Sequence, residues 1–537
     1  MKDLLLFQDV CKAMAEPSFY PHPVEQVEIR ETHISFVFLA GDWVYKLKKP
    51  VSFGFLNFHT LHDRHYFCLR EVFLNQRLTR NVYDKVVGIC RDKRGRYRLD
   101  SGQALEFAVK MRRLPAEACL VELLKRRSVT DDELSQLGRH LSEFYSRSEN
   151  NPEIDHYGDP EVIAFNMEEN FQQVEPFVDG LLDRERWEFI REVSRAFFHD
   201  WSRLFENRIT NGCIRDGHGD LRAEHVYFYG GIQIIDCIEF NDRFRYGDVV
   251  ADLAFLHMDL ESLDQANASK AIMSAYSEHS GDHQCYSLLD FYSAYRAIVK
   301  VKVTCLRSTE VDDPETQSSL QLNAGYYLEQ AYRYALQFSR PTLWVFCGLP
   351  ATGKSALADK LSQTLSMAIL KSDRIRKEGR DRFALKEEIL PFGQGIYRSA
   401  MRQRVYARML ALAQELLKKG QSVILDATFS RTKWREEAMQ LATDLDSNVV
   451  FLECVCSLKT IKGRLEQREQ EQSISDARLS HLHEMVESFE ALREIPVEML
   501  VRLDTELPLG RCLLELLAAG YASKCTQVKQ VLAGALA

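Results

Sequence analysis

Hydrophobic and polar residues form two short β-prone runs near the start of the chain, which predict two strands. The runs cover residues 33–39 (HISFVFL) and 43–48 (WVYKLK), and Ala-Gly-Asp separates them as in a hairpin. A helical pattern follows over residues 62–78, and further strand-like runs fit residues 85–90 and 104–111. A hairpin, a helix and more strands in that order predict a small lobe of mixed α and β structure.

The pattern then becomes helical over residues 130–205 and 248–337, with strands and loops predicted between them. It changes again at Pro341, because proline disfavours helix at the residue before it. Beyond this point strands alternate with helices. Strands are expected at residues 343–347, 368–370, 423–425 and 449–453, and helices at residues 355–365 and 399–419. This alternation predicts a parallel sheet.

The first chemical signal follows the first of these strands. Eight residues fit the pattern GxxxxGK[ST]: Gly348, Leu349, Pro350, Ala351, Thr352, Gly353, Lys354 and Ser355. Glycines let backbone N–H groups close around phosphates, and the helix that follows adds a partial positive charge. Lys354 is expected to reach the β- and γ-phosphates, and Ser355 to ligate Mg²⁺. The C-terminal part is therefore expected to bind ATP or GTP.

Charged residues near this loop have the spacing of a phosphotransferase. Asp373 follows the second strand and can accept a proton from an acceptor hydroxyl, and it also fits an ordinary helix cap. Arg376, one helical turn later, can hold an anionic substrate. Asp426 ends a strand and suits orientation of Mg²⁺. Arg464 and Arg468, four apart on a predicted helix, fit either a lid over the phosphates or a solvated face.

A second group of motifs lies in the N-terminal half. Asp220 belongs to a His-Gly-Asp segment, and Asp236 ends a strand-like run downstream. This order follows the logic of a kinase catalytic loop, in which Asp220 accepts the hydroxyl proton and Asp236 holds Mg²⁺. Lys46 on the hairpin would bind phosphate and Glu71 on the next helix would pair with it. Lys48 lies on the same face of the strand and competes with Lys46 for that role.

These motifs resemble those of two kinase groups. The C-terminal motifs resemble P-loop kinases that include polynucleotide, zeta-toxin-like and gluconate-kinase-like enzymes, and the N-terminal motifs resemble aminoglycoside phosphotransferases. The chain is identified as a member of a group of bacterial fusion proteins that joins the two. The resemblance implies an α+β protein-kinase-like domain, then an α/β P-loop NTPase with a parallel sheet, then a tail. The expected ranges are 1–338 (small lobe 25–115, large lobe 116–338), 341–515 and 516–537.

The N-terminal half departs from the family pattern at two points. His225 stands where the family places an asparagine that ligates the metal, and Mg²⁺ prefers oxygen to imidazole nitrogen. The hairpin offers Gly41 in place of a glycine-rich phosphate loop. His225 is thus a candidate metal ligand, and a degenerate, non-catalytic domain is the alternative.

Composition limits the classes of molecule that the chain is expected to bind. The net charge is -9 and the pI about 6.0, so a nucleic-acid substrate would need a local basic patch and is disfavoured. The 13 cysteines form no CxxC pair, which argues against a disulfide framework and a zinc site. The sequence has neither a signal-like nor a membrane-spanning apolar run, and a cytoplasmic location is expected.

Three functions remain open. The chain is a two-headed kinase that phosphorylates a hydroxyl of a small molecule, a P-loop kinase with a regulatory N-terminal domain, or a nucleotide-gated binding protein with ATPase activity. The sequence does not name the acceptor, because specificity depends on pocket shape.

Overall fold

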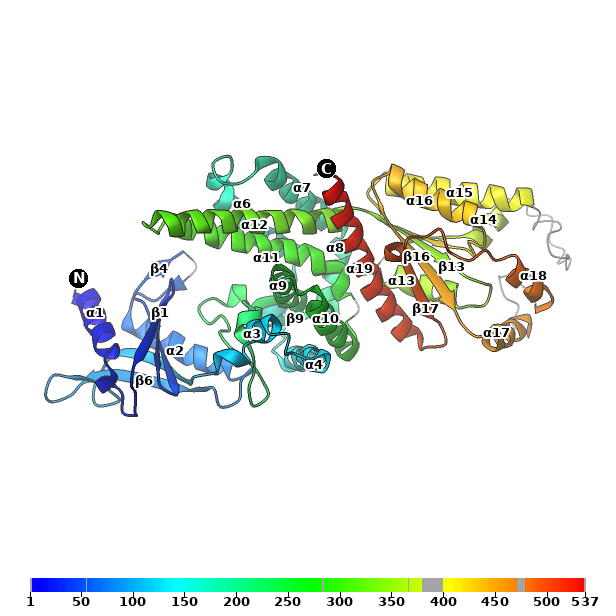
Figure 1. Cartoon of the computed structure of the whole chain (residues 1–537). Coiled ribbons are helices and arrows are strands. Elements are labelled where there is room, and N and C mark those ends of the chain that lie inside the picture. Colours follow the sequence, from blue (N-terminus) through cyan, green and yellow to red (C-terminus); the bar gives the residue numbers. More distant parts are fainter. Residues whose placement is uncertain are drawn as a thin grey trace. The chain divides into compact units, whose positions relative to one another are not determined.

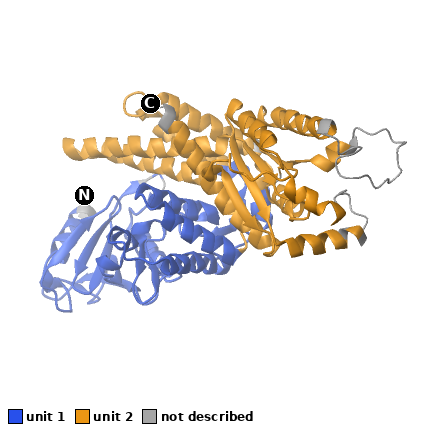
Figure 2. Cartoon of the chain, turned by 45° about the vertical axis from the view of Figure 1, so that its right-hand side comes forward, with its two compact units in different colours: residues 1–163, 205–280 blue, residues 164–204, 281–537 orange. Residues whose placement is uncertain are grey.

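The computed structural model describes residues 2–54, 56–282, 284–365, 367–378, 399–470 and 479–535. It divides into two compact units (Figure 2). Unit 1 holds residues 1–163 and 205–280, and unit 2 holds residues 164–204 and 281–537. The limits predicted at 338 and 341 lie inside unit 2 and stay predictions.

Unit 1 begins with a six-stranded antiparallel sheet in the order β1-β2-β3-β8-β6-β7 (Figure 1). Its strands are β1 (Val27–Glu31), β2 (Ser35–Ala40), β3 (Trp43–Lys48), β6 (Tyr83–Arg91), β7 (Tyr97–Leu99) and β8 (Ala104–Arg112). Alternate residues point to opposite faces, so Phe38 packs with helix α1 (Lys2–Met14) and Leu39 with helix α2 (Leu61–Asn75). The predicted hairpin and helix are confirmed, whereas α1 and β1 were not predicted.

The rest of unit 1 is mainly helical, as predicted. Its helices are α3 (Leu120–Lys125), α4 (Asp131–Arg147), α5 (Pro152–Asp155), α9 (Val249–Ser262) and α10 (Ala266–Ser280). Unit 1 also contains three short antiparallel strand pairs: β4 (Ser52–Phe53) with β5 (Leu56–Asn57), which precede α2, β9 (Ile214–Asp216) with β12 (Tyr246–Asp248), and β10 (Val226–Phe228) with β11 (Ile232–Ile234). The last two pairs flank the His-Gly-Asp segment and so position it.

Unit 2 combines long helices with a parallel sheet. Helices precede the sheet: α6 (Pro160–Val174) and α8 (Ser202–Thr210), which both straddle the division, and α7 (Arg184–Asp200), α11 (Cys285–Ser308) and α12 (Pro314–Ser339). The sheet has the order β14-β15-β13-β16-β17, and every neighbouring pair is parallel. Its strands are β13 (Thr342–Cys347), β14 (Ala368–Lys371), β15 (Val423–Asp426), β16 (Asn448–Val455) and β17 (Leu500–Asp504). The predicted parallel sheet is confirmed, and β17 was not predicted.

Helices cover both faces of this sheet (Figure 1). The covering helices are α13 (Lys354–Leu365), α15 (Ser399–Leu417), α16 (Thr432–Asp444) and α19 (Leu509–Ala535). The shorter helix α14 (Ser372–Glu378) follows β14, and α17 (Leu458–Gln470) and α18 (Leu482–Glu487) lie between β16 and β17 in the sequence. Parallel strands bring their carboxyl ends to one edge, so the segments after β13, β14, β15 and β17 meet there. Helix α19 packs on α12, α13 and β17. None of the helices in the described part of the chain is long and apolar enough to cross a bilayer.

Candidate functional site

The loop between β13 and α13 has the backbone of a phosphate cradle. Gly348 has φ +131° and Gly353 has φ +88°, a region that side chains with a Cβ rarely occupy. A Cβ at Gly348 would also lie 2.6 Å from the carbonyl oxygen of Cys454. Glycine is therefore required at residue 348 by both backbone angle and space. Lys354 opens α13, and its ammonium group donates to the carbonyl of Leu349 in the same loop.

Asp426 lies at the end of β15, beside the start of α13. The Ser355 side chain lies close enough to this carboxylate to act on its pKa. Burial raises the pKa of Asp426 above its ordinary value, and the interaction with Ser355 opposes that rise. A hydroxyl and a carboxylate are hard oxygen donors, so this pair fits the Mg²⁺ that the loop implies.

Asp373 and Arg376 lie in the first turns of α14, which follows β14. The Arg376 guanidinium donates to the Asp373 carboxylate at 2.8 Å, so the two residues share a face as their spacing predicts. Both side chains are partly exposed, at 13% for Arg376 and 37% for Asp373. The charge of Asp373 also raises the pKa of Asp426. The two carboxylates, at the carboxyl ends of β14 and β15, therefore belong to one site.

The neighbouring Thr428 is held by an aromatic residue of α15. The Tyr406 hydroxyl accepts the backbone N–H of Phe429 at 3.0 Å and lies 3.3 Å from the Thr428 hydroxyl. Phe429 has φ 44°, in the left-handed region, and this bond helps to hold it there. Tyr406 was not predicted, because its distance in sequence from Thr428 hides the contact.

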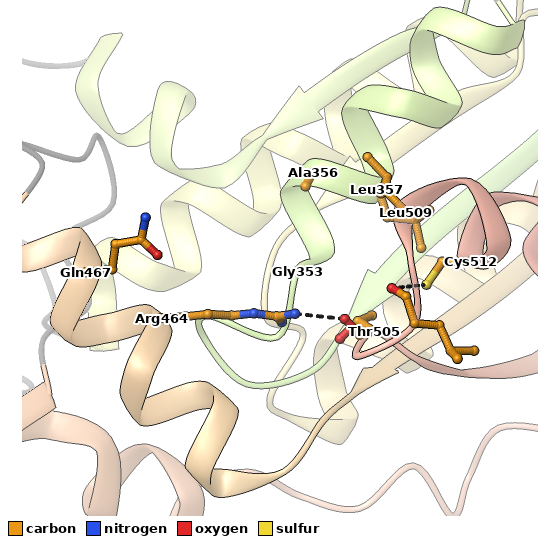
Figure 3. A pocket seen from close by; sticks show the side chains of 9 residues that line it. Gly353, Ala356, Leu357, Arg464, Gln467, Thr505, Leu509 and Cys512 are labelled. Carbon is orange, nitrogen blue, oxygen red and sulfur yellow. Dashed lines mark hydrogen bonds between the residues drawn. The ribbon is translucent and has the colours of Figure 1, made fainter.

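A cavity of about 390 Å³ lies beside the P-loop (Figure 3). Its lining residues are Gly353, Ala356, Leu357, Arg464, Gln467, Thr505, Leu507, Leu509 and Cys512. The Arg464 guanidinium donates to the carbonyls of Thr505 at 2.8 Å and Ala351 at 3.3 Å. Arg464 is thus in contact with the P-loop. Arg468 lies on the same helix, α17, and its side chain is outside the described residues.

Thr505 connects β17 to the P-loop and was not predicted from the sequence. Its hydroxyl donates to the carbonyl of Thr352 at 2.6 Å. The alternating run at residues 500–504 (LVRLD) carries a weak strand signal that would have placed Thr505 at the same sheet edge.

Unit 1 holds the second group of predicted residues. Asp252 of α9 holds the loop of Asp220 in place. Its carboxylate accepts hydrogen bonds from the backbone N–H groups of His218 at 2.6 Å and Gly219 at 2.9 Å. The Arg222 guanidinium donates to both oxygens of Asp220 at 3.0 and 2.9 Å. Burial raises the pKa of Asp220, but the charges of Arg222 and His225 and the hydrogen bond from Arg222 together outweigh it and hold the pKa below the ordinary value. Arg222 was not predicted.

Asp236 follows strand β11 and has φ 67°, in the left-handed region of backbone conformation. Lys46 donates to Asp236, and its ammonium group also lies 3.0 Å from Glu71. The structure therefore brings Lys46, Glu71 and Asp236 together. Lys48 pairs with Glu71 as well, at 2.6 Å, and its side chain is fully buried.

His225 lies between the two aspartates. Its Nδ1 is 2.8 Å from the carbonyl of Asp220, and its Nε2 is 3.7 Å from a carboxylate oxygen of Asp236. Asp236 offers Mg²⁺ the oxygen it prefers, and Nε2 of His225 offers the softer nitrogen. Among the described residues, no cluster of three or more His, Cys, Asp or Glu has the geometry of a metal site.

Comparison with known proteins supports the C-terminal assignment. Residues 343–492 match the family described as AAA domain. Solved structures give weaker likenesses. A gluconokinase from Sinorhizobium meliloti 1021 is 16% identical with a TM-score of 0.25, covering 36% of this chain and 96% of that chain. A choline/ethanolamine kinase family protein from Mesorhizobium loti is 14% identical with a TM-score of 0.36, covering 62% and 98%.

Similarity over most of the chain comes from mycobacterial proteins. Uncharacterized protein Rv2004c of Mycobacterium tuberculosis is 33% identical over 451 residues, which covers 83% of this chain and 88% of the relative. Uncharacterized protein Mb2027c of Mycobacterium bovis gives the same figures. The match extends over both units, well beyond the P-loop domain, and the chain therefore belongs to the family of these mycobacterial proteins.

Proposed function

We propose that unit 2 is an ATP-dependent phosphotransferase that moves the γ-phosphoryl group of ATP, or of GTP, to a hydroxyl of a small molecule. One observation carries the proposal. A P-loop, the Asp426–Ser355 pair and the Asp373–Arg376 pair all occupy the carboxyl edge of one parallel sheet. A nucleotide hydrolase needs the first two of these features, and a transferase also needs a base and a clamp for the acceptor.

Each residue has a role in that reaction. Lys354 and the loop N–H groups bind the phosphates, and the cavity beside Arg464 receives the nucleoside. Ser355 and Asp426 hold Mg²⁺, which neutralises charge on the phosphates when it is bound. Asp373 takes the proton of the acceptor hydroxyl, and Arg376 holds an anionic group of the acceptor, which frees Asp373 from their mutual pair.

Unit 1 is proposed as a second, kinase-like phosphotransferase of the aminoglycoside phosphotransferase type. The contacts that support it are those of Lys46 with Glu71 and Asp236, and the bracing of the Asp220 loop by Asp252. In this role Lys46 binds phosphate, Asp220 is the base and Asp236 holds the metal. His225 supports the alternative, in which unit 1 binds a nucleotide and regulates without transferring phosphate.

The test uses γ-labelled ATP and a metabolite extract. Lys354→Ala is expected to remove the labelled product of unit 2, and Asp373→Asn to lower kcat by about 10²–10⁴ with little loss of ATP affinity. The matched control is Lys360→Ala, an exposed lysine on the same helix as Lys354. ADP release without any labelled acceptor would refute the transferase and leave a nucleotide-gated binding protein.

Asp220→Ala in the same extract tests unit 1 alone. If unit 1 transfers phosphate, a labelled product must persist in Lys354→Ala protein and disappear in the double variant. An unchanged product pattern in Asp220→Ala would leave unit 1 with a regulatory role.

A further inference from the structure

Unit 1 contains a buried charge cluster behind its candidate site. Lys48 of β3 is fully buried, and its ammonium group pairs with Glu71 of α2 at 2.6 Å and with Glu239. The side chains of Glu71 and Glu239 are 0% and 4% exposed. Lys48 thus joins the central sheet, helix α2 and the segment that follows Asp236.

The two lysines of β3 pair with different oxygens of the Glu71 carboxylate. Lys46 lies 3.0 Å from Oε1 of Glu71, and Lys48 lies 2.6 Å from Oε2. They differ in the other partner. Lys46 also contacts Asp236, whose side chain is 44% exposed, whereas Lys48 contacts the buried Glu239. Lys46 therefore faces the open side of the site, and Lys48 faces the closed side.

The environment of Lys48 holds its ammonium group among buried neighbours. Its ammonium group also lies 5.0 Å from the centre of the Phe58 ring, in a cation–π contact. A buried ammonium group is stable only while its charged partners remain in place. Burial raises the pKa of Glu71, but the charges of Lys46 and Lys48 outweigh it and keep this carboxylate ionised.

We propose that Lys48 is a positioning residue that fixes Glu71 and the Asp236 segment relative to each other while Lys46 binds the phosphates. The inference rests on the proposed nucleotide site of unit 1. A phosphate that recruits Lys46 withdraws it from Asp236, and the Asp236 carboxylate then becomes available to a metal. Glu71 stays anchored through Oε2 during that change, because Lys48 is buried together with both of its carboxylate partners. The two lysines that compete in the sequence thus have separate roles.

The test removes the buried pair without leaving an unpaired charge. Lys48→Met alone would leave Glu239 buried without a charged partner. The informative variant is therefore Lys48→Met with Glu239→Met, because apolar residues of similar volume often replace a buried ion pair without loss of stability. All variants carry Lys354→Ala, so that unit 1 alone is measured. The matched control is Lys49→Met with Glu31→Met, which removes an ion pair on the same sheet in which Glu31 is 60% exposed.

The measurements are binding of Mg²⁺-ATP, steady-state ATP hydrolysis with water as acceptor, and the thermal midpoint. We expect Lys46→Met to lose ATP affinity. The Lys48/Glu239 variant should keep its thermal midpoint and its KM for ATP within about threefold while kcat falls on the order of 10²-fold, as misplaced catalytic groups do. The Lys49/Glu31 control should match its parent in kcat.

Two results would overturn the inference, and they are distinguishable. A Lys354→Ala parent that fails to bind Mg²⁺-ATP removes the proposed site of unit 1 and the inference with it. A parent that binds and turns over ATP, together with a Lys48/Glu239 variant of unchanged kcat, leaves the site standing and refutes the positioning role alone. Should the Lys48/Glu239 variant unfold, Lys48→Arg provides the second measurement, because it keeps a cation beside Glu71 and Glu239. The positioning role then requires that Lys48→Arg keeps the kcat of its Lys354→Ala parent.

Discussion

His218 is a buried imidazole whose two ring nitrogens are both in use. Its Nε2 lies 3.0 Å from the carbonyl of Ile235, and its Nδ1 accepts the backbone N–H of Asp220 at 3.2 Å. These partners fit a neutral ring with its proton on Nε2, because a protonated Nδ1 cannot accept. Burial lowers the pKa of His218 from 6.5 to about 4.

This lowered pKa makes the free energy of unfolding of unit 1 depend on pH. The unfolded chain binds a proton at the ordinary pKa of 6.5, and the folded chain at about 4, so protons favour unfolding between these values. Stability is therefore complete above pH 6.5 and falls as the pH is lowered. The linkage predicts a loss of about 2 kcal/mol at pH 5 and about 3 kcal/mol at pH 4 from this residue alone.

The perturbation is His218→Gln, which removes the titrating group. Denaturant-dependent hydrogen exchange in peptides from residues 205–280 gives the free energy of unfolding of unit 1 at each pH. The wild-type free energy should fall more steeply than that of the variant between pH 6.5 and 4. His59→Gln, at an exposed histidine, controls for the substitution itself. Parallel wild-type and His218→Gln curves, or an imidazole that titrates near 6.5, would refute the assignment of a neutral buried ring.

Three further outcomes are expected. Burial raises the pKa of Asp426, so this carboxylate should take up a proton at a higher pH than an ordinary aspartate does. The affinity of the P-loop for Mg²⁺, measured with Mn²⁺ as a competitor, should therefore fall at that higher pH on acidification, and Asp426→Asn should remove this pH dependence. Gly520→Ala should destabilise unit 2 by about 1–3 kcal/mol in thermal unfolding. The reason is that the new Cβ would lie 2.5 Å from the Trp344 ring, whereas Gly510→Ala on the same helix meets nothing within 4 Å and should not destabilise. Asp252→Asn should cost about 1.5–3 kcal/mol in unit 1 by weakening two charge-assisted bonds, with amides of the Asp220 loop exchanging faster.

The sequence was sufficient to predict those structural features that depend on residues close together in the chain. The P-loop is one such case, because the glycines that permit its backbone stand next to the lysine that it presents. The pair of Asp373 with Arg376 is another, since helical spacing alone places both on one face. The alternation of strands and helices likewise predicted the parallel sheet.

Residues that meet across the fold could not be found in this way. Lys46 and Lys48 have the same orientation on β3, and their difference comes from Glu239, which is remote in sequence. Thr505 meets the carbonyl of Thr352, which is equally remote in sequence, and only a weak strand signal before it indicated its place at the sheet edge. The sequence likewise gives no sign that α11 and α12 join the P-loop domain in one compact unit, because that grouping depends on contacts with α19.

The two candidate sites share no residue, and each lies within one unit. Asp220 belongs to unit 1, and Lys354 belongs to unit 2. Substitutions with no shared partner usually have additive effects. If both units transfer phosphate independently, the activities lost in Asp220→Ala and in Lys354→Ala must together equal the wild-type activity, and the double variant must be inert. A single variant that removes more than its own share would require a coupling free energy between the sites, because the nucleotide at one would then change turnover at the other.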